Sequence, residues 1–139
     1  MPWLKSPEGP VRVVLDTNVI IAAALYPSHT PGRVFSLCLT GAVQNFTSQA
    51  ICTEVEDVVY RNDLAMLFPM YLAHSVLIVP TINVTLCADP DDDMFLECAL
   101  AANAQFLISG DAKVLAIGIL GNTRILSPKA FLEWWERHH

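Results

Sequence analysis

Short apolar runs alternate along the chain with longer segments in which apolar residues recur every three or four positions. Residues 11–15 and 106–109 are runs of the kind that form strands buried on both faces of a sheet. In residues 51–59 the apolar side chains fall on one face of a helix. Strands that alternate with helices indicate βαβ units, in which a parallel sheet carries helices on both faces. We therefore expect an α/β fold built as a Rossmann-like three-layer α/β/α sandwich with a central parallel sheet.

Capping and turn residues divide the chain into the expected elements. Ser48 and Ser127 suit N-cap positions, and Thr30 suits the cap of a helix that begins at Pro31 and stops at Gly41. The expected strands are residues 11–15, 42–47, 76–79, 106–109 and 124–126. The other expected helices are residues 19–25, 51–59, 62–72 (broken at Pro69), 91–103, 113–117 and a last one after Ser127. Between them, residues 80–90 are expected to form a loop or a short edge piece.

The length of 139 residues corresponds to one domain, so we expect a single domain over residues 1–139 with its core at about residues 11–135. Hydrophobic residues make up 53% of the chain and charged residues 16%, which excludes intrinsic disorder. With so few charges, some apolar surface stays exposed, and we expect a second copy of the chain to cover it in a homodimer. The candidate surfaces are residues 65–72 and the helix around Val34 and Leu37.

We expect neither a membrane span nor a disulfide framework. Polar residues and prolines, such as Asp16 and Pro27, cut the apolar runs before they reach the length of a bilayer. The cysteines form no C-x-x-C pair, and all lie among apolar residues: Cys38, Cys52, Cys87 and Cys98. Buried free thiols in a reducing compartment are the simplest interpretation, which places the protein in the cytoplasm.

The formal net charge is −6, from 14 acidic and 8 basic residues. This balance argues against a protein that binds nucleic acid through a basic stripe on its surface. It leaves open a nuclease whose acidic side chains hold metal ions.

Two questions about the acidic residues stay open at this point: the role of Asp16, and the choice between Glu54 and Glu56. Asp16 interrupts a long apolar run, where a buried carboxylate is costly unless it is hydrogen-bonded, paired or bound to a cation. It either caps the helix that follows, with help from Asn18, or serves a cation. Glu54 and Glu56 fall at opposite edges of the apolar face of their helix, so helical periodicity does not choose between them.

The densest acidic cluster stands at the start of an expected helix and comprises Asp89, Asp91, Asp92 and Asp93. Carboxylates in a first turn complement the helix dipole, but this accounts for one or two of them and not for four that repel one another. A calcium loop is excluded because Met94 and Leu100 occupy its glycine and glutamate positions.

Asp16 and Asp111 each follow an expected strand, and in parallel sheets polar sites form beyond the carboxyl ends of the strands. Taken alone, Asp111 is also a good turn residue. Carboxylates that converge at one sheet edge favour a hard divalent cation such as Mg²⁺ or Mn²⁺, which relieves their repulsion. Such a site activates water and stabilises the charge that develops during phosphodiester cleavage. The four histidines stand in no ligand spacing, so zinc is not expected.

The order and spacing of these motifs resemble the PIN domain (PilT N-terminus) family. Residues 13–20, Val-Val-Leu-Asp-Thr-Asn-Val-Ile, resemble the opening of that domain. The later motifs that resemble the family are Ser48 with Glu54, residues 89–96, residues 107–111 and the closing residues 124–132. The likeness runs from about residue 11 to residue 134, and the nearest branch is the group of bacterial and archaeal toxins from toxin–antitoxin pairs (VapC-like).

The resemblance implies an endoribonuclease that depends on Mg²⁺ or Mn²⁺ and hydrolyses phosphodiester bonds of RNA. Toxin members of the family usually dimerise and are inhibited by a protein antitoxin. The implied catalytic residues, which are also the metal ligands, are Asp16, Glu54, Asp93 and Asp111, so the resemblance selects Glu54 over Glu56. The implied auxiliary residues are Asn18, Asp91, Asp92 and Ser109. Lys113 departs from the family, which often has a further Asp there, and this bears on a second metal site.

Two other functional classes are compatible with parts of the pattern. A non-catalytic PIN-fold module that binds RNA or protein is the main alternative, supported by the acidic net charge and by Lys113. A phosphatase or a receiver domain that uses Asp16 as nucleophile is disfavoured. Such a phosphatase has a second Asp where this chain has Asn18. A receiver domain requires an acidic pair after its first strand, and this chain has none there.

Overall fold

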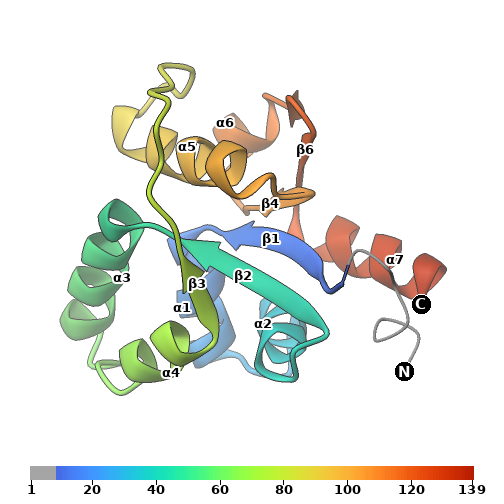
Figure 1. The fold of residues 1–139 in the computed structure, drawn as a ribbon. Helices are drawn as coiled ribbons and strands as arrows, with labels where there is room; N and C mark the ends of the chain where they lie inside the picture. Colours follow the sequence, from blue (N-terminus) through green and yellow to red (C-terminus); the bar gives the residue numbers. More distant parts are fainter. Residues whose placement is uncertain (1–8) are drawn as a thin grey trace.

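The computed structural model describes residues 9–139, and the fold is shown in Figure 1. The single domain expected for residues 1–139 extends over residues 1–8, which lie outside the described part, and it stays a prediction. In chain order the elements are β1 (Val11–Leu15), α1 (Thr17–Leu25), α2 (Thr30–Leu39), β2 (Val43–Thr47), α3 (Gln49–Arg61), α4 (Leu67–Ala73), β3 (Ser75–Leu77), the 3₁₀ turn η2 (Pro90–Asp92), α5 (Asp93–Ala102), β4 (Phe106–Ile108), α6 (Ala112–Leu115), β5 (Ile119–Leu120), β6 (Thr123–Leu126) and α7 (Pro128–His138).

Within residues 9–139, six strands form one sheet in the order β3-β2-β1-β4-β6-β5. All neighbouring pairs are parallel except β5 and β6, which are antiparallel. The chain moves outward from β1 to β2 and β3, and it then crosses to the other side of β1 to form β4. The strand order therefore reverses between β1 and β4, and α/β sheets bind their ligands beyond the carboxyl ends of the strands at such a point.

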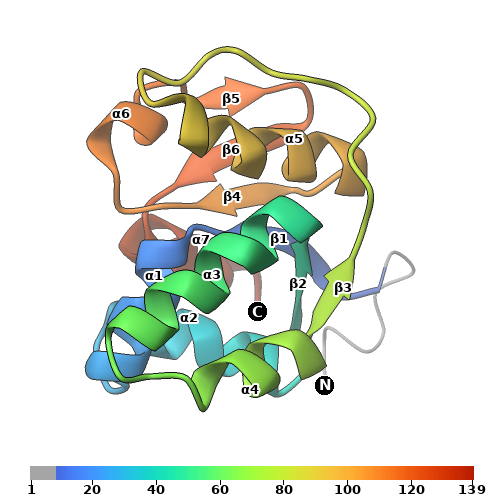
Figure 2. The same ribbon diagram turned by 90° about the vertical axis from the view of Figure 1, so that its left-hand side faces the viewer.

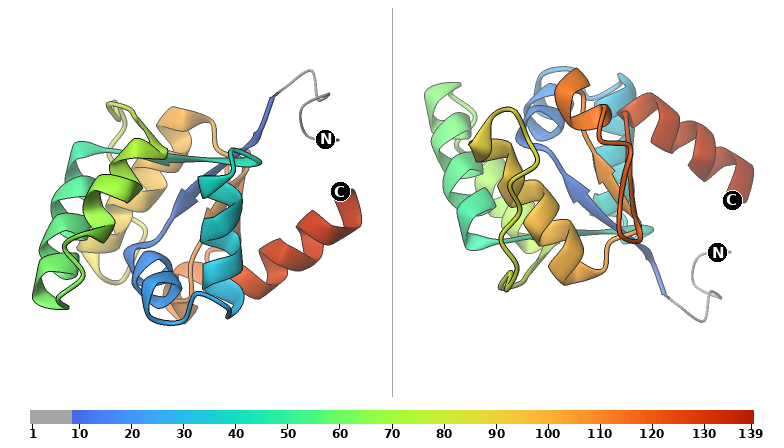
Figure 3. Two further views of the ribbon diagram at one scale, coloured as in Figure 1. Left: turned by 90° about the horizontal axis from the view of Figure 1, so that it is seen from below. Right: turned by 90° about the horizontal axis from the view of Figure 1, so that it is seen from above.

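Helices cover both faces of this sheet. In Figure 1, α5 and α6 lie above the strands, whereas α1, α2 and α4 lie below them, and Figure 3 shows the two layers from below and from above. The helix α7 follows β6 and packs against α2. Figure 2 shows β4, β6 and β5 as the upper half of the sheet. The predicted α/β sandwich with a central, mostly parallel sheet is confirmed.

The core lies where β1 and β4 pass between the helical layers. Val13, Val14 and Leu15 are wholly buried, as are Leu107 and Ile108. This burial explains why both strands are apolar at all positions except Arg12 of β1, rather than at every second one. The two strands are in parallel register, and the residue that follows each of them emerges at the same edge of the sheet.

Three local features differ from the sequence-based expectations. Pro69 does not break its helix, because it lies in the first turn of α4, where a missing N–H leaves no hydrogen bond unmade. The α2 helix begins at Thr30, so that His29 rather than Thr30 occupies the N-cap. The two-residue strand β5 is an addition, paired with β6 across the turn at Gly121.

The surface carries apolar side chains, although not at every position predicted. Met66, Met70 and Leu72 are 90%, 41% and 44% exposed, in agreement with the surface expected at residues 65–72. Val34, in contrast, is a wholly buried core residue of α2 and forms no surface patch. None of the described helices combines the length and apolar character that crossing a bilayer requires.

The cysteines are all free thiols, and three of them are buried. Burial raises the pKa of Cys38 and of Cys98 to about 12, so these thiols stay protonated at neutral pH. This agrees with the prediction of buried free thiols for Cys38, Cys52 and Cys98, whereas Cys87 is only partly buried because it lies in the loop before α5. The cytoplasmic location stays a prediction.

Candidate functional site

Asp16 lies where β1 ends and α1 begins, at the carboxyl edge of the sheet. The residue is 5% exposed, and its two carboxylate oxygens have different partners. Oδ1 accepts a hydrogen bond from the backbone N–H of Asn18 at 3.0 Å, and Oδ2 accepts one from the Ser109 hydroxyl at 2.7 Å. Asp16 is thus a helix cap, which is the first of the two interpretations left open by the sequence, and it is a buried acidic group as well. Asn18 supports it through the main chain, while the Asn18 side chain is exposed.

Ser109 connects Asp16 to Asp111. Ser109 directly follows β4 and is wholly buried, and its hydroxyl oxygen accepts a hydrogen bond from the Asp111 backbone N–H at 3.1 Å while it donates to Asp16. Asp111 is half-buried and caps α6, with Oδ1 accepting from the backbone N–H of Lys113 at 2.8 Å. One serine hydroxyl therefore links the residues that follow two neighbouring strands.

Glu54 reaches the same edge from α3. Its Oε2 accepts a hydrogen bond from the Thr17 hydroxyl at 2.5 Å, which joins α3 to the first residue of α1. Glu54 is half-buried, whereas Glu56 is exposed on the same helix. The structure therefore places Glu54, and not Glu56, beside the β1–α1 junction. The sequence carries no signal for Thr17, because its hydrogen-bond partner Glu54 is 37 positions away and is brought close only by the fold.

Asp93 has a different role from the other carboxylates. It opens α5 and is 7% exposed, and its Oδ1 accepts hydrogen bonds from the backbone N–H groups of Leu86 and Cys87 at 3.0 and 2.8 Å. These bonds, chiefly the one from Cys87, hold the pKa of Asp93 below its usual value. One turn further along α5, Glu97 accepts from the backbone N–H of Val84 at 2.8 Å. Asp93 and Glu97 thus fasten the loop between β3 and α5 along the helix.

Asp92 faces the other acidic groups. Its pKa is raised to about 6, first by burial and then by the negative charges of its neighbours, which are Asp16, Asp89, Asp111 and Glu54. Because Coulomb repulsion falls with distance, these effects mean that the groups share one electrostatic field. Asp92, at the start of α5, therefore belongs to the same electrostatic environment as the carboxylates of β1, α3 and α6.

Asp91 borders an open groove next to this edge. Asp91 is exposed, and its backbone N–H donates to Asp89 at 3.0 Å. The groove has a volume of about 440 Å³ and is lined by Ala50, Thr53, Glu54, Asp57, Asp91 and Met94. It lies against α3 and includes Glu54 in its lining.

The donor set of this edge fits a hard divalent cation. Every group is a carboxylate oxygen, which suits Mg²⁺ or Mn²⁺. Within residues 9–139, no three His, Cys, Asp or Glu side chains already meet around one point as a metal site. A bound cation would therefore have to draw the carboxylates of Asp16, Glu54, Asp92 and Asp111 closer together.

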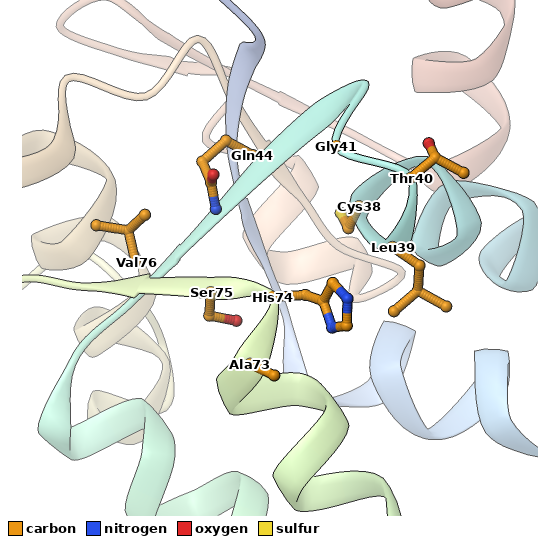
Figure 4. A pocket seen from close by; sticks show the side chains of 9 residues that line it. All are labelled: Cys38, Leu39, Thr40, Gly41, Gln44, Ala73, His74, Ser75 and Val76. Carbon is orange, nitrogen blue, oxygen red and sulfur yellow. The ribbon is translucent and has the colours of Figure 1, made fainter.

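A second hollow lies at the opposite edge of the sheet and is shown in Figure 4. It has a volume of about 350 Å³ and lies where β2 and β3 begin, next to the end of α2. No carboxylate lines it, and the His74 ring is bonded through Nδ1 to the Met70 carbonyl at 2.8 Å. Its lining consists of Cys38, Leu39, Thr40, Gly41, Gln44, Ala73, His74, Ser75 and Val76. The acidic side chains that could hold a metal ion therefore lie at the carboxyl edge and not in this hollow.

Comparison with known proteins gives a consistent picture. The family model described as PIN domain matches residues 12–113. An uncharacterised protein of Methanocaldococcus jannaschii is 28% identical over 146 aligned positions, which cover 91% of this chain and 93% of that protein.

Two solved structures share the fold at 14% identity. One is VapBC2 from Rickettsia felis bound to a DNA fragment from its promoter, with a TM-score of 0.59 over 83% of this chain and 97% of that one. The other is the PIN domain of T. brucei RRP44, with a TM-score of 0.53 over 94% of this chain and 83% of that one. At this identity the likeness concerns the fold alone.

Proposed function

Because the chain belongs to the PIN domain family, whose members are generally nucleases, we propose that it is a metal-dependent endoribonuclease and the toxin of a toxin–antitoxin pair. The observation that carries this proposal is that buried hydroxyls hold three carboxylates at the point where the strand order reverses. Ser109 links Asp16 to Asp111, and Thr17, the residue after Asp16, bonds to Glu54. The resemblance of the sequence motifs to VapC-like members of the family supports the second half of the proposal, and the chain shares its fold with VapBC2.

In this proposal, Asp16, Glu54 and Asp111 bind Mg²⁺ or Mn²⁺ together with one carboxylate from the start of α5. When bound, such an ion activates water and stabilises negative charge on a phosphate group. Ser109 orients Asp16 through a 2.7 Å hydrogen bond, so that one oxygen of the carboxylate keeps a fixed direction. The groove beside Glu54 and Asp91 is the proposed path of the RNA strand.

We assign the α5 position to Asp92 and give Asp93 a supporting role. The family resemblance implies Asp93 as the ligand, but Asp93 Oδ1 already accepts two backbone hydrogen bonds from the loop. Asp92 is half-buried, and its side chain makes no capping hydrogen bond to α5. The two residues are adjacent, and the loop held by Asp93 fixes where Asp92 lies.

The first test is removal of the metal. We expect the purified protein to cleave single-stranded RNA in the presence of Mn²⁺ or Mg²⁺, to lose this activity in EDTA, and to regain it when excess Mn²⁺ is added. Cleavage is measured as the appearance of short fragments from an end-labelled RNA on a denaturing gel. RNA that is bound but never cut, with or without metal, would instead support the non-catalytic binding module.

Matched variants at the start of α5 test the assignment of Asp92. We expect Asp92→Asn to weaken Mn²⁺ binding by about 10-fold or more, because even the loss of a group that only supports a metal ligand typically lowers the affinity by that factor. Asp93→Asn replaces a charged acceptor of two hydrogen bonds with a neutral one, so it should lower the free energy of unfolding by about 1 kcal/mol. Calorimetric titration and urea unfolding measure the two effects. Loss of Mn²⁺ binding in Asp93→Asn with unchanged stability would identify Asp93 as the ligand.

The proposed partners are a protein antitoxin and a second copy of the chain. Both proposals are supported by exposed apolar side chains on α4 and by an apolar groove of about 220 Å³ between α1, α2 and α4. Leu39, Leu67 and Met70 are among the residues that line this groove. Light scattering at high protein concentration tests the homodimer, and a monodisperse monomer would contradict it.

A further inference from the structure

Thr17 makes a contact that the sequence pattern does not predict and to which the proposed chemistry assigns no role. The residue directly follows Asp16, begins α1 and is 4% exposed. Its hydroxyl donates to Glu54 Oε2 at 2.5 Å, and the two residues are 37 positions apart in the sequence. A buried hydroxyl on α1 is thus bonded to a carboxylate on α3.

This contact matters because Glu54 has little else to hold it. A glutamate side chain has several rotatable bonds and loses considerable conformational freedom when it is fixed. Among the described residues, the Thr17 hydroxyl is the only group that the structure shows hydrogen-bonded to the Glu54 carboxylate. A hydrogen bond from a hydroxyl to a carboxylate at this distance is of the short, charge-assisted kind. It fixes one oxygen of Glu54 against the β1–α1 junction.

We propose that Thr17 is a positioning residue that holds the Glu54 carboxylate at the cation site. This inference rests on the proposed metal-dependent function and adds a residue to it. Thr17 does for Glu54 what Ser109 does for Asp16, since each carboxylate accepts one hydrogen bond from a buried hydroxyl. The β1–α1 junction then supplies one ligand, Asp16, and orients a second one through the next residue.

The test compares Thr17→Val, which keeps the shape of the side chain but removes the hydroxyl, with Thr17→Ser, which keeps the hydroxyl. Because loss of a group that orients a ligand costs 10–100-fold in metal affinity, we expect the Kd for Mn²⁺ to rise by about that factor in Thr17→Val. Thr17→Ser should bind Mn²⁺ within about threefold of the wild type, which is below the 10–100-fold loss expected when an orienting group is removed. Isothermal titration calorimetry with MnCl₂ gives each Kd.

Thr123→Val is the matched control. Thr123 is also a buried threonine, 2% exposed, and its hydroxyl donates to the Ala104 carbonyl at 2.7 Å, at the opposite edge of the sheet from Asp16. This variant loses a buried hydrogen bond of similar length, so it should lower the thermal stability without changing the Kd for Mn²⁺. A general loss of stability is thereby separated from an effect on the site.

A double-mutant cycle in EDTA tests the contact without metal. If Thr17 acts through Glu54, the effect of Thr17→Val on the unfolding midpoint should be smaller in the Glu54→Gln background than in the wild type, because the partner charge is already gone. Additive effects, or a Thr17→Val protein with the wild-type Kd for Mn²⁺, would overturn the positioning role while leaving the proposed function standing. A wild-type protein that binds no Mn²⁺ would overturn both.

Discussion

Replacing Asp16 with Asn is expected to reduce RNA cleavage by at least about 100-fold, because a direct ligand should matter no less than the orienting groups that cost 10–100-fold. The substitution keeps the size of the side chain, and the amide oxygen still accepts from the Asn18 backbone N–H. The change removes a negative charge and places an NH₂ group opposite the Ser109 hydroxyl, which already accepts from the Asp111 backbone N–H. Initial cleavage rates of an end-labelled RNA at saturating Mn²⁺ measure the effect.

Glu56→Gln is the control for this experiment. It also replaces one carboxylate with an amide, but Glu56 is exposed on α3 and no contact joins it to the carboxyl edge. Its cleavage rate should equal that of the wild type. If Asp16→Asn cleaved as fast as Glu56→Gln, the activity would have to come from another site or from a contaminating nuclease, and the assignment of the carboxyl edge would be wrong.

The sequence was sufficient to predict the fold because burial on both faces of the sheet leaves a clear pattern. The strands β1 and β4 are apolar at every position except Arg12, and their limits agree with the predicted runs to within one residue. Ser48 and Ser127 were recognisable as N-caps because each hydroxyl accepts from a backbone N–H three residues later, at Ile51 and Ala130. Local chemistry of this kind is written in a few adjacent residues.

The site was predictable only in outline. That Asp16 and Asp111 follow neighbouring parallel strands depends on strand order, which the alternation of elements suggests. The distinction between Asp92 and Asp93 depends on the path of the loop before α5, whose backbone N–H groups bind Asp93. The contact between Thr17 and Glu54 depends on how α1 packs against α3. Neither the path of this loop nor the packing of α1 against α3 leaves a periodic signal in the sequence.

The second large effect is expected at Gly32, in the first turn of α2. A Cβ atom built there would lie 2.0 Å from the Pro27 carbonyl oxygen, 2.4 Å from its carbonyl carbon and 2.6 Å from its Cα. All three are backbone atoms, so a side-chain rotation cannot relieve the clash, and the turn before α2 would have to move. Overpacking typically costs 1–3 kcal/mol, and we expect Gly32→Ala to lower the free energy of unfolding by about 3 kcal/mol. This loss should exceed the gain of about 1 kcal/mol that alanine normally brings to a helix.

Urea unfolding followed by circular dichroism measures this effect as a lower midpoint with an unchanged slope. Gly110→Ala is the control, because a Cβ atom at Gly110 meets no atom within 4 Å and its backbone conformation is open to other residues. That variant should stay within about 0.5 kcal/mol of the wild type, as surface substitutions usually do. If Gly32→Ala were as stable as Gly110→Ala, the turn at Pro27 could not lie against α2. The close approach of backbone to backbone, rather than helix propensity, is therefore what requires glycine at position 32.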